Sequence, residues 1–263
     1  MTTVGINGVT GRMGGALLAT AADREDVTVA FGVAPDPAGV DAVPAYTPGE
    51  VATALAEHDP DGVIDFSTPA GTANAAAACA EAGVALVVGT TGFDDDQRAV
   101  LSDASRSVPV LEAANFARGV QALLDALEAA LSALPEYDVE VLETHHNGKQ
   151  DAPSGTAETI LETIGEYREF ETVPGREGVQ PRTDDEVGML VRRAGNVRGE
   201  HEIVLADNDE VVTLAHRAED RGVFAAGALD AAVWLAGREA GQYGFADVIH
   251  GSGAGAESGG EQP

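Results

Sequence analysis

The chain has 263 residues and a formal net charge of −29, which comes from 44 acidic residues against 15 lysines and arginines. A charge of this size and sign repels nucleic acid and anionic membrane surfaces, so the composition excludes both as partners. A chain of this length can bury a core in one or two domains. Its acid-rich, lysine-poor composition is typical of proteins that work in high salt, where ions screen self-repulsion.

Cysteine usage and the amino-terminus predict a cytoplasmic protein. Cys79 is the single cysteine, so no intramolecular disulfide can form, and we expect this thiol to be buried in its alanine-rich stretch. The amino-terminus enters a strand-like run at once, which gives no sign of a signal peptide. No apolar stretch is long enough to span a membrane without charge or glycine breaks.

Strand-like and helix-like segments alternate through the first half of the chain. The expected strands are residues 3–7, 27–33, 62–66, 85–88 and 108–112. The expected helices are residues 12–22, 50–57, 71–82 and 94–106. This alternation predicts an α/β fold with a parallel, doubly wound sheet.

The pattern changes after residue 115. We expect a long amphipathic helix at 119–134, a strand at 138–143 and a helix at 154–167 with Ser154 as its cap. Proline, glycine and charge at 173–187 indicate a loop, and alternating runs at 201–206 and 210–216 indicate antiparallel strands. A helix is expected at 223–240, and the Gly/Ser/Glu-rich end, 251–263, is expected to be disordered.

A glycine-rich turn joins the first expected strand to the first expected helix. Glycines at such a turn let the backbone approach a pyrophosphate, and the helix N-terminus supplies free N–H groups. The spacing is G-x-x-G-x-x-G rather than G-x-G-x-x-G, so the position in a β-α series carries the prediction. The candidate cofactor-binding residues of this turn are Gly8, Val9, Thr10, Gly11, Arg12 and Met13.

Other loops at strand ends extend this candidate cofactor site, because ligands of such sheets bind beyond the carboxyl ends of strands. The residues that read the adenosine ribose should lie about twenty positions after the glycine turn. Asp36 lies there without a neighbouring lysine or arginine, which favours NADH over NADPH; a plain acidic surface residue is the alternative. The further candidates are Gly89, Thr90, Thr91, Ala113, Ala114, Asn115 and Phe116.

The only lysine of the chain, Lys149, follows a His-His pair. Histidine has a pKa near neutrality and suits proton transfer, and lysine is a compact cationic donor that arginine cannot replace there. His145, His146 and Lys149 are therefore candidate acid–base or substrate-binding residues. A zinc site would need a further ligand that is not adjacent in sequence, and a purely structural His pair is the other alternative.

A helix start follows this segment at Ser154, Gly155 and Thr156. Its N–H groups and hydroxyls are suited to a substrate carboxylate. The remaining histidines carry less information: His201 and His216 fall in the expected antiparallel strands, where packing is the simpler interpretation, and His58 and His250 lie in polar surroundings.

Together these motifs resemble the dihydrodipicolinate reductase family. The resemblance covers about residues 4–248 and rests on Gly-x-x-Gly-Arg-Met-Gly, on Gly-Thr-Thr-Gly-Phe at 89–93, on the Asn-Phe loop and above all on Glu-x-His-His-x-x-Lys-x-Asp-Ala-Pro-Ser-Gly-Thr-Ala. It implies a nicotinamide-dependent 4-hydroxy-tetrahydrodipicolinate reductase that gives tetrahydrodipicolinate in the diaminopimelate route of lysine biosynthesis, with a small dicarboxylate substrate.

The resemblance also implies the architecture and the roles of residues. It implies a Rossmann-type dinucleotide-binding domain of residues 1–116 and 222–250, and a mixed α/β domain of residues 117–221 for substrate binding and homotetramer assembly. His145 is implied as the acid–base residue and Lys149 as the proton donor, and no metal is implied. The implied substrate contacts are His146, Ser154, Gly155 and Thr156.

At the expected cofactor site this sequence departs from the family pattern, and two other functions are alternatives to the reductase activity. Family members accept NADH or NADPH, but this chain has Asp36 and no basic residue after the second strand, and Thr68 where some relatives carry arginine. The first alternative is another nicotinamide enzyme, such as an amino-acid or semialdehyde dehydrogenase. The second is a non-catalytic NAD-sensing module, which would bind NADH without turnover.

Overall fold

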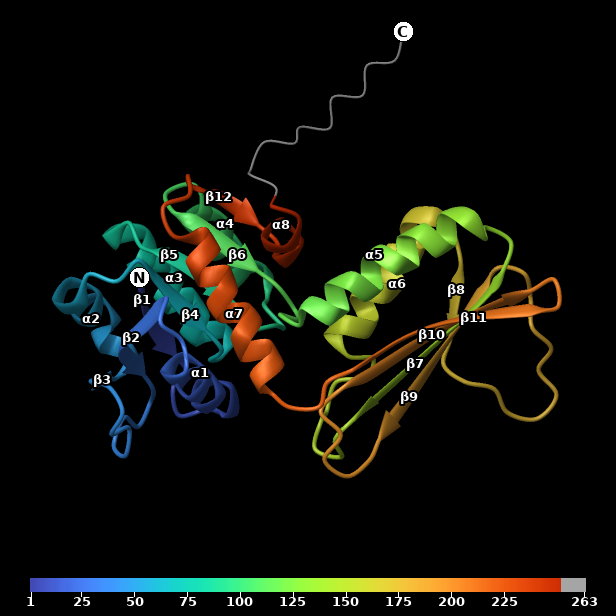
Figure 1. Ribbon diagram of the computed structural model, residues 1–263, viewed down its shortest axis with the longest axis horizontal. Coiled ribbons are helices and arrows are strands. Elements are labelled where there is room, and N and C mark those ends of the chain that lie inside the picture. The colour runs from blue at the N-terminus through green and yellow to red at the C-terminus, as the bar shows by residue number, and fades with distance from the viewer. Residues whose placement is uncertain (252–263) are drawn as a thin grey trace, which may run out of the picture. The chain divides into compact units, whose positions relative to one another are not determined.

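The computed structural model describes residues 1–251, and the chain divides into two units (Figure 1). Unit 1 combines Met1–Phe116 with the segment that starts at Phe224, and unit 2 is Ala117–Val223. From residue 252 onward, the tail expected to be disordered lies outside the described residues. No helix among residues 1–251 is long and apolar enough to cross a bilayer.

A seven-stranded parallel sheet forms the centre of unit 1, in the order β12-β6-β5-β4-β1-β2-β3. Its order reverses at β1, which lies between β2 and β4, and ligands of such sheets bind at this point. The strands are β1 (Thr2–Asn7), β2 (Val27–Val33), β3 (Ala45–Tyr46), β4 (Gly62–Asp65), β5 (Ala85–Val88), β6 (Pro109–Glu112) and β12 (Gly241–Tyr243).

Helices cover both faces of this sheet. One buried cluster joins the strands to α1, α7 and α8, and a second joins them to α2, α3 and α4. The doubly wound Rossmann-type fold is therefore confirmed. The helices are α1 (Arg12–Ala22), α2 (Val51–His58), which follows a short 3-10 turn at Pro48–Glu50, α3 (Pro69–Ala82), α4 (Asp95–Ser105), α7 (Gly222–Leu235) and α8 (Phe245–His250).

Unit 2 is a mixed five-stranded sheet with two helices on one face (Figure 1). Its order is β11-β10-β7-β9-β8; β10 is antiparallel to β7 and β11, while β9 is parallel to β7 and β8. The elements are α5 (Arg118–Ala133), β7 (Asp138–His145), α6 (Gly155–Tyr167), β8 (Glu171–Val173), β9 (Glu186–Arg193), β10 (Glu200–Asp207) and β11 (Glu210–Arg217).

Most of the predicted elements form close to their predicted bounds, and three predictions need correction. The expected loop at 173–187 overlaps β8 and β9 at its two ends, and β9 was missed. The helix expected at 223–240 ends at Leu235, and Gly237, two residues further on, has a left-handed φ of +77°. The strand expected at 138–143 continues to His145. The extension matters for the site, because alternate strand residues share a face, which places Glu143 beside His145.

Candidate active site

The glycine turn of unit 1 has the geometry of an anion-binding loop. Gly8 has a φ of +87°, and a Cβ there would lie 2.5 Å from the carbonyl oxygen of Phe66. A Cβ on Gly14 would lie 2.4 Å from the carbonyl oxygens of Gly8 and Val9. Gly11 is the N-cap of α1 and offers no side chain to the first helical N–H groups. These groups are left for an external acceptor, as a cofactor pyrophosphate requires.

A cavity of about 380 Å³ opens beside this turn. It brings together five of the predicted cofactor residues, namely Arg12, Met13, Gly89, Thr90 and Thr91. It also contains four residues from the end of β4 and the start of α3 that were not assigned to the site, namely Phe66, Ser67, Thr68 and Pro69. A signal for them exists in the sequence, because a polar cap and a proline directly follow a buried strand.

Not all predicted cofactor residues line this cavity. Gly8, Val9, Thr10 and Gly11 form the turn that precedes α1 and do not line the cavity. Asp36 is exposed after β2, and its Oδ1 accepts a hydrogen bond from the N–H of Ala38 at 3.1 Å.

The third predicted loop divides between surface and core. Ala113 and Asn115 are half-buried after β6, and Ala114 is exposed. Phe116 is 1% exposed and packs edge-on against Phe66, with ring centroids 5.7 Å apart. Phe116 therefore supports the aromatic wall of the cavity through Phe66 rather than lining it.

In unit 2, the C-terminal end of β7 carries a buried carboxylate–imidazole pair. Glu143 is fully buried, and its Oε2 hydrogen-bonds to Nδ1 of His145. A carboxylate can only accept, so Nδ1 carries the proton and Nε2 is the atom left for chemistry. A Cβ on Gly199 would lie 3.1 Å from this Nε2, so the glycine leaves room for the ring.

Within residues 1–251, three groups hold the Glu143 carboxylate. Its Oε1 accepts from a guanidinium nitrogen of Arg193 at 2.8 Å and from the N–H of Ser154 at 3.2 Å. Burial acts to raise the pKa of Glu143, but the hydrogen bonds and charges of His145 and Arg193 prevail and lower it to about 2. The carboxylate is therefore ionised at neutral pH and keeps the His145 tautomer fixed.

Lys149 lies in the loop that follows β7. Its Nζ donates to Oδ2 of Asp151 at 2.7 Å, and its N–H donates to the carbonyl of His146 at 3.1 Å. Burial acts to raise the pKa of Asp151, but the Lys149 hydrogen bond and charge lower it. The carbonyl of Asp151 also accepts from Arg193 at 2.6 Å, so Arg193 connects the Lys149 loop to Glu143.

The segment that the sequence predicts as an anion cradle lies at the start of α6. Ser154 caps the helix, as predicted, by accepting from the N–H of Ala157, and Gly155 and Thr156 open the first turn. Thr156 is 6% exposed and Ser154 is 2% exposed, so both hydroxyl groups lie in a buried environment. His146 follows β7 in a half-buried position.

His201, which the sequence assigns to packing, is buried as expected and also contacts two residues of the candidate site. It is 2% exposed, its Nε2 lies 3.2 Å from the Ser154 hydroxyl, and its ring meets that of His145 at a centroid distance of 5.3 Å. Burial lowers the pKa of His201 to about 4, so the ring is neutral at pH 7. Glu143, His145 and His201 place ligand-type atoms within 4.8 Å of one another, but Arg193 already neutralises the carboxylate.

Comparison with known proteins identifies the family. Residues 2–116 match the model for the N-terminal part of dihydrodipicolinate reductase, and residues 119–249 match that for the C-terminal part. The 4-hydroxy-tetrahydrodipicolinate reductase of Haloarcula marismortui is 58% identical over 95% of this chain and 99% of its own. That of Natronomonas pharaonis is 56% identical over 92% and 98%.

This chain belongs to the dihydrodipicolinate reductase family. It is a nicotinamide-dependent oxidoreductase with 4-hydroxy-tetrahydrodipicolinate reductase activity, and its salt-adapted composition agrees with a halophilic origin. The fold is also that of a dipicolinate-bound dihydrodipicolinate reductase from Paenisporosarcina, with a TM-score of 0.76 at 24% identity over 94% of this chain and 99% of the other.

Proposed function

We propose that His145 and Lys149 carry the proton chemistry of the reductase reaction. The observation that carries this proposal is the hydrogen bond that Nδ1 of His145 donates to the buried, ionised Glu143. It leaves Nε2 as the ring atom that can hold or release a proton. Lys149 is the only lysine of the chain, and its ammonium group supplies the second donor.

The substrate of this reaction is a small dicarboxylate, in the diaminopimelate route of lysine biosynthesis. Its carboxylates need local positive charge in a protein of charge −29. Lys149, His146 and the N-terminal turn of α6 at Gly155 and Thr156 supply this, because a helix start favours anions. Thr156 and Ser154 contribute through the turn that they form rather than through exposed hydroxyl groups.

The cofactor binds to unit 1, where the glycine turn and the 380 Å³ cavity fit a dinucleotide. A nicotinamide bound there supplies the hydride. Arg12 is the only charged residue among those that line the cavity, and Asp36 is the first acid after β2. We therefore favour NADH, since a 2′-phosphate would meet Asp36 and the negative field of the protein.

The assembly proposed is a homotetramer in the cytoplasm, built on the sheet of unit 2. Helices α5 and α6 pack on one face, and no described element of unit 2 covers the other (Figure 1). Leu190 and Val211, on that other face, are 41% and 64% exposed, which favours burial against further copies. Buried Cys79 is a free thiol, as is usual for cytoplasmic proteins. Light scattering on the purified protein measures the subunit number.

Substitutions of the two proton-transfer residues test the function. We expect His145→Ala and Lys149→Ala each to lower kcat by about a hundredfold or more, the usual scale for a positioned acid or base. Steady-state oxidation of NADH with freshly generated substrate measures this. Arg106→Ala, which removes an exposed cation at the end of α4, is the matched control for charge and should leave kcat unchanged.

A second control separates charge from proton transfer at position 149. Lys149→Arg keeps the cation but replaces the ammonium donor, so it should remain impaired in kcat while recovering part of the substrate affinity. Near-wild-type kcat in both alanine variants would contradict this assignment of the site.

A further inference from the structure

A second buried carboxylate, Asp65, lies at the end of β4 in unit 1. It is fully buried, and no basic side chain among residues 1–251 pairs with it. All of its partners are neutral donors. Its oxygens accept from Asn7 Nδ2 at 2.5 Å, from Thr72 and Thr90 hydroxyls at 2.7 Å each, and from the N–H and hydroxyl of Ser67 at 3.1 Å.

These donors come from each segment that borders the cofactor cavity. Asn7 is the last residue of β1 and directly precedes the glycine turn. Ser67 and Thr90 line the cavity itself, after β4 and β5. Thr72 belongs to the first turn of α3. One carboxylate thereby connects the ends of three parallel strands at the point where the strand order reverses.

The network also fixes which groups face a ligand. The hydroxyl proton of Thr90 is directed to Asp65, and the same hydroxyl accepts from the N–H of Ser67 at 3.1 Å. Thr90 can therefore offer a cofactor its methyl and backbone groups but not its hydroxyl proton. Nδ2 of Asn7 also donates to the carbonyl of Gly71 at 3.3 Å, which fixes the orientation of this amide.

We propose that Asp65 is a positioning residue of the cofactor site. Its carboxylate holds the glycine turn, the β4–α3 turn and the loop after β5 at the spacing that a dinucleotide needs. This role rests on the proposed cofactor site. A carboxylate suits it because the Nδ2 of Asn7 and the N–H of Ser67 both donate towards this point, and a carboxylate can only accept.

An acid-to-amide change tests the proposal. In Asp65→Asn one oxygen becomes a donor that faces other donors. An inverted Asn7 amide would relieve this only by turning its own oxygen to the Gly71 carbonyl. We expect the Kd for NADH, followed by fluorescence titration, to rise about tenfold, the scale of an unsatisfied buried polar group. The KM for the dicarboxylate should stay unchanged.

Two companion variants keep the test decisive. Val63→Ala, also on β4 and 2% exposed, lowers stability through packing alone, so it should reduce Tm without changing the Kd for NADH. If Asp65→Asn does not fold, Thr90→Val removes one donor of the same network and should still raise the Kd several-fold.

The outcomes separate this inference from the cofactor site on which it rests. An unchanged Kd in folded Asp65→Asn, or equal Kd changes in Asp65→Asn and Val63→Ala, would overturn the role of Asp65. A Kd for NADH that is the same in Arg12→Gln, Gly11→Val and wild type would instead overturn the proposed cofactor site.

Discussion

The two units each bury a carboxylate completely, and they satisfy it in opposite ways. Asp65 of unit 1 is held by neutral amide, hydroxyl and backbone donors. Glu143 of unit 2 is held by an imidazole, a guanidinium and one backbone N–H. Neutral donors fix the geometry of the strand ends around a ligand cavity. Charged and titratable partners couple the carboxylate to proton chemistry instead, so the same residue class serves positioning in one unit and reactivity in the other.

The largest effect should come from an acid-to-amide change at the buried carboxylate of unit 2, Glu143. We expect Glu143→Gln to lower kcat by about a hundredfold. An amide can accept at only one end, so its NH2 group faces either Nδ1 of His145 or the donors of Arg193 and Ser154, and the neutral amide no longer stabilises the imidazolium. The Kd for NADH should stay unchanged, which is the reverse of the pattern expected for Asp65→Asn. Kinetics and fluorescence titration on both variants measure the contrast.

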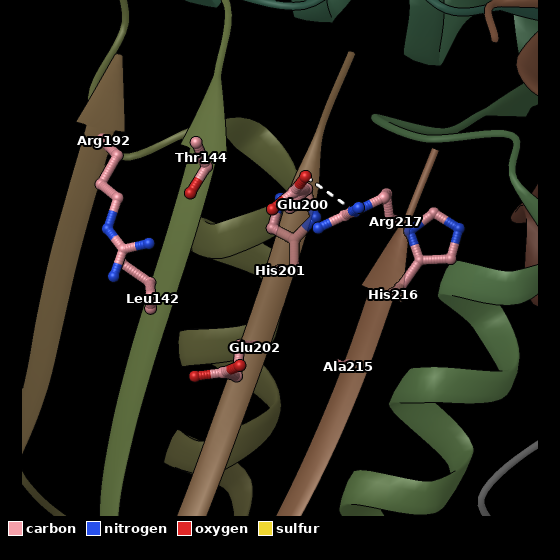
Figure 2. A pocket seen from close by; sticks show the side chains of 9 residues that line it. All are labelled: Leu142, Thr144, Arg192, Glu200, His201, Glu202, Ala215, His216 and Arg217. Carbon is pink, nitrogen blue, oxygen red and sulfur yellow. Dashed lines mark ion pairs between the residues drawn. The ribbon is translucent and has the colours of Figure 1, made fainter. Parts of the chain in front are cut away.

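Glu202→Gln is the matched control for Glu143→Gln. Glu202 is exposed on β10 and lines a shallow pocket of about 220 Å³ on that sheet (Figure 2). Its side chain forms no hydrogen bond with His145, so kcat should stay at the wild-type value. Equal losses of kcat in the two variants would show that the effect of Glu143→Gln is one of lost charge alone.

How far the sequence anticipates this site depends on the distance between partners. The glycine turn and the Ser154 cap are local, and they form where the pattern predicts them. Asp65 is 58 residues from Asn7, and Glu143 is 50 residues from Arg193, so neither network is visible in one sequence. The long motif contains Glu143, but only the extension of β7 to His145 places the two side chains on one face.

The missed strand β9 has a similar explanation. Proline, glycine and charged residues at 173–187, with acidic residues at 184–186, indicate a loop when read locally. In the fold, Glu186 forms an ion pair with Arg176, and the Glu140 carboxylate of β7 occupies the space beside Gly188. A residue that reads as solvent-exposed is thus neutralised by a distant arginine, and the strand is stabilised by tertiary contacts that override local preference.

The two carboxylate sites should also differ in how the stability around them depends on pH, because His201 lies beside the Glu143 site. Burial lowers the pKa of His201 to about 4 from an ordinary value near 6.5, so the unfolded chain binds this proton more readily. The stabilisation is fully present above about pH 6.5 and is lost as pH falls towards 4, up to about 3 kcal/mol. His201→Gln should remove this part of the acid sensitivity. Apart from its carboxylate, the Asp65 network contains no titratable group.

Thermal and urea unfolding at pH 7 and pH 4.5 measure this difference. Ile203→Val, on the same buried face of β10, is the control and should cost about 1 kcal/mol at both pH values. Parallel losses of stability in wild type and His201→Gln between these pH values would show that His201 is not the acid-sensitive group.

The smallest expected effect concerns the choice between NADH and NADPH, for which unit 1 offers two charged residues, Asp36 and Arg12. Asp36 is exposed, and Arg12 is the only charged residue that lines the cavity. A 2′-phosphate near Asp36 would be repelled, so NADH should bind more tightly than NADPH by several-fold at low salt. The difference in affinity should narrow as salt screens the repulsion.

Asp36→Asn should improve NADPH binding more than NADH binding, while Arg12→Gln should weaken NADPH binding more than NADH binding. Fluorescence titration of both cofactors across a KCl series measures all three differences. Tighter NADPH binding by wild type at low salt, abolished in Arg12→Gln, would show that Arg12 reaches the phosphate and outweighs Asp36. The Asp65 carboxylate and its neutral donors would then position a site whose specificity is set by one exposed arginine.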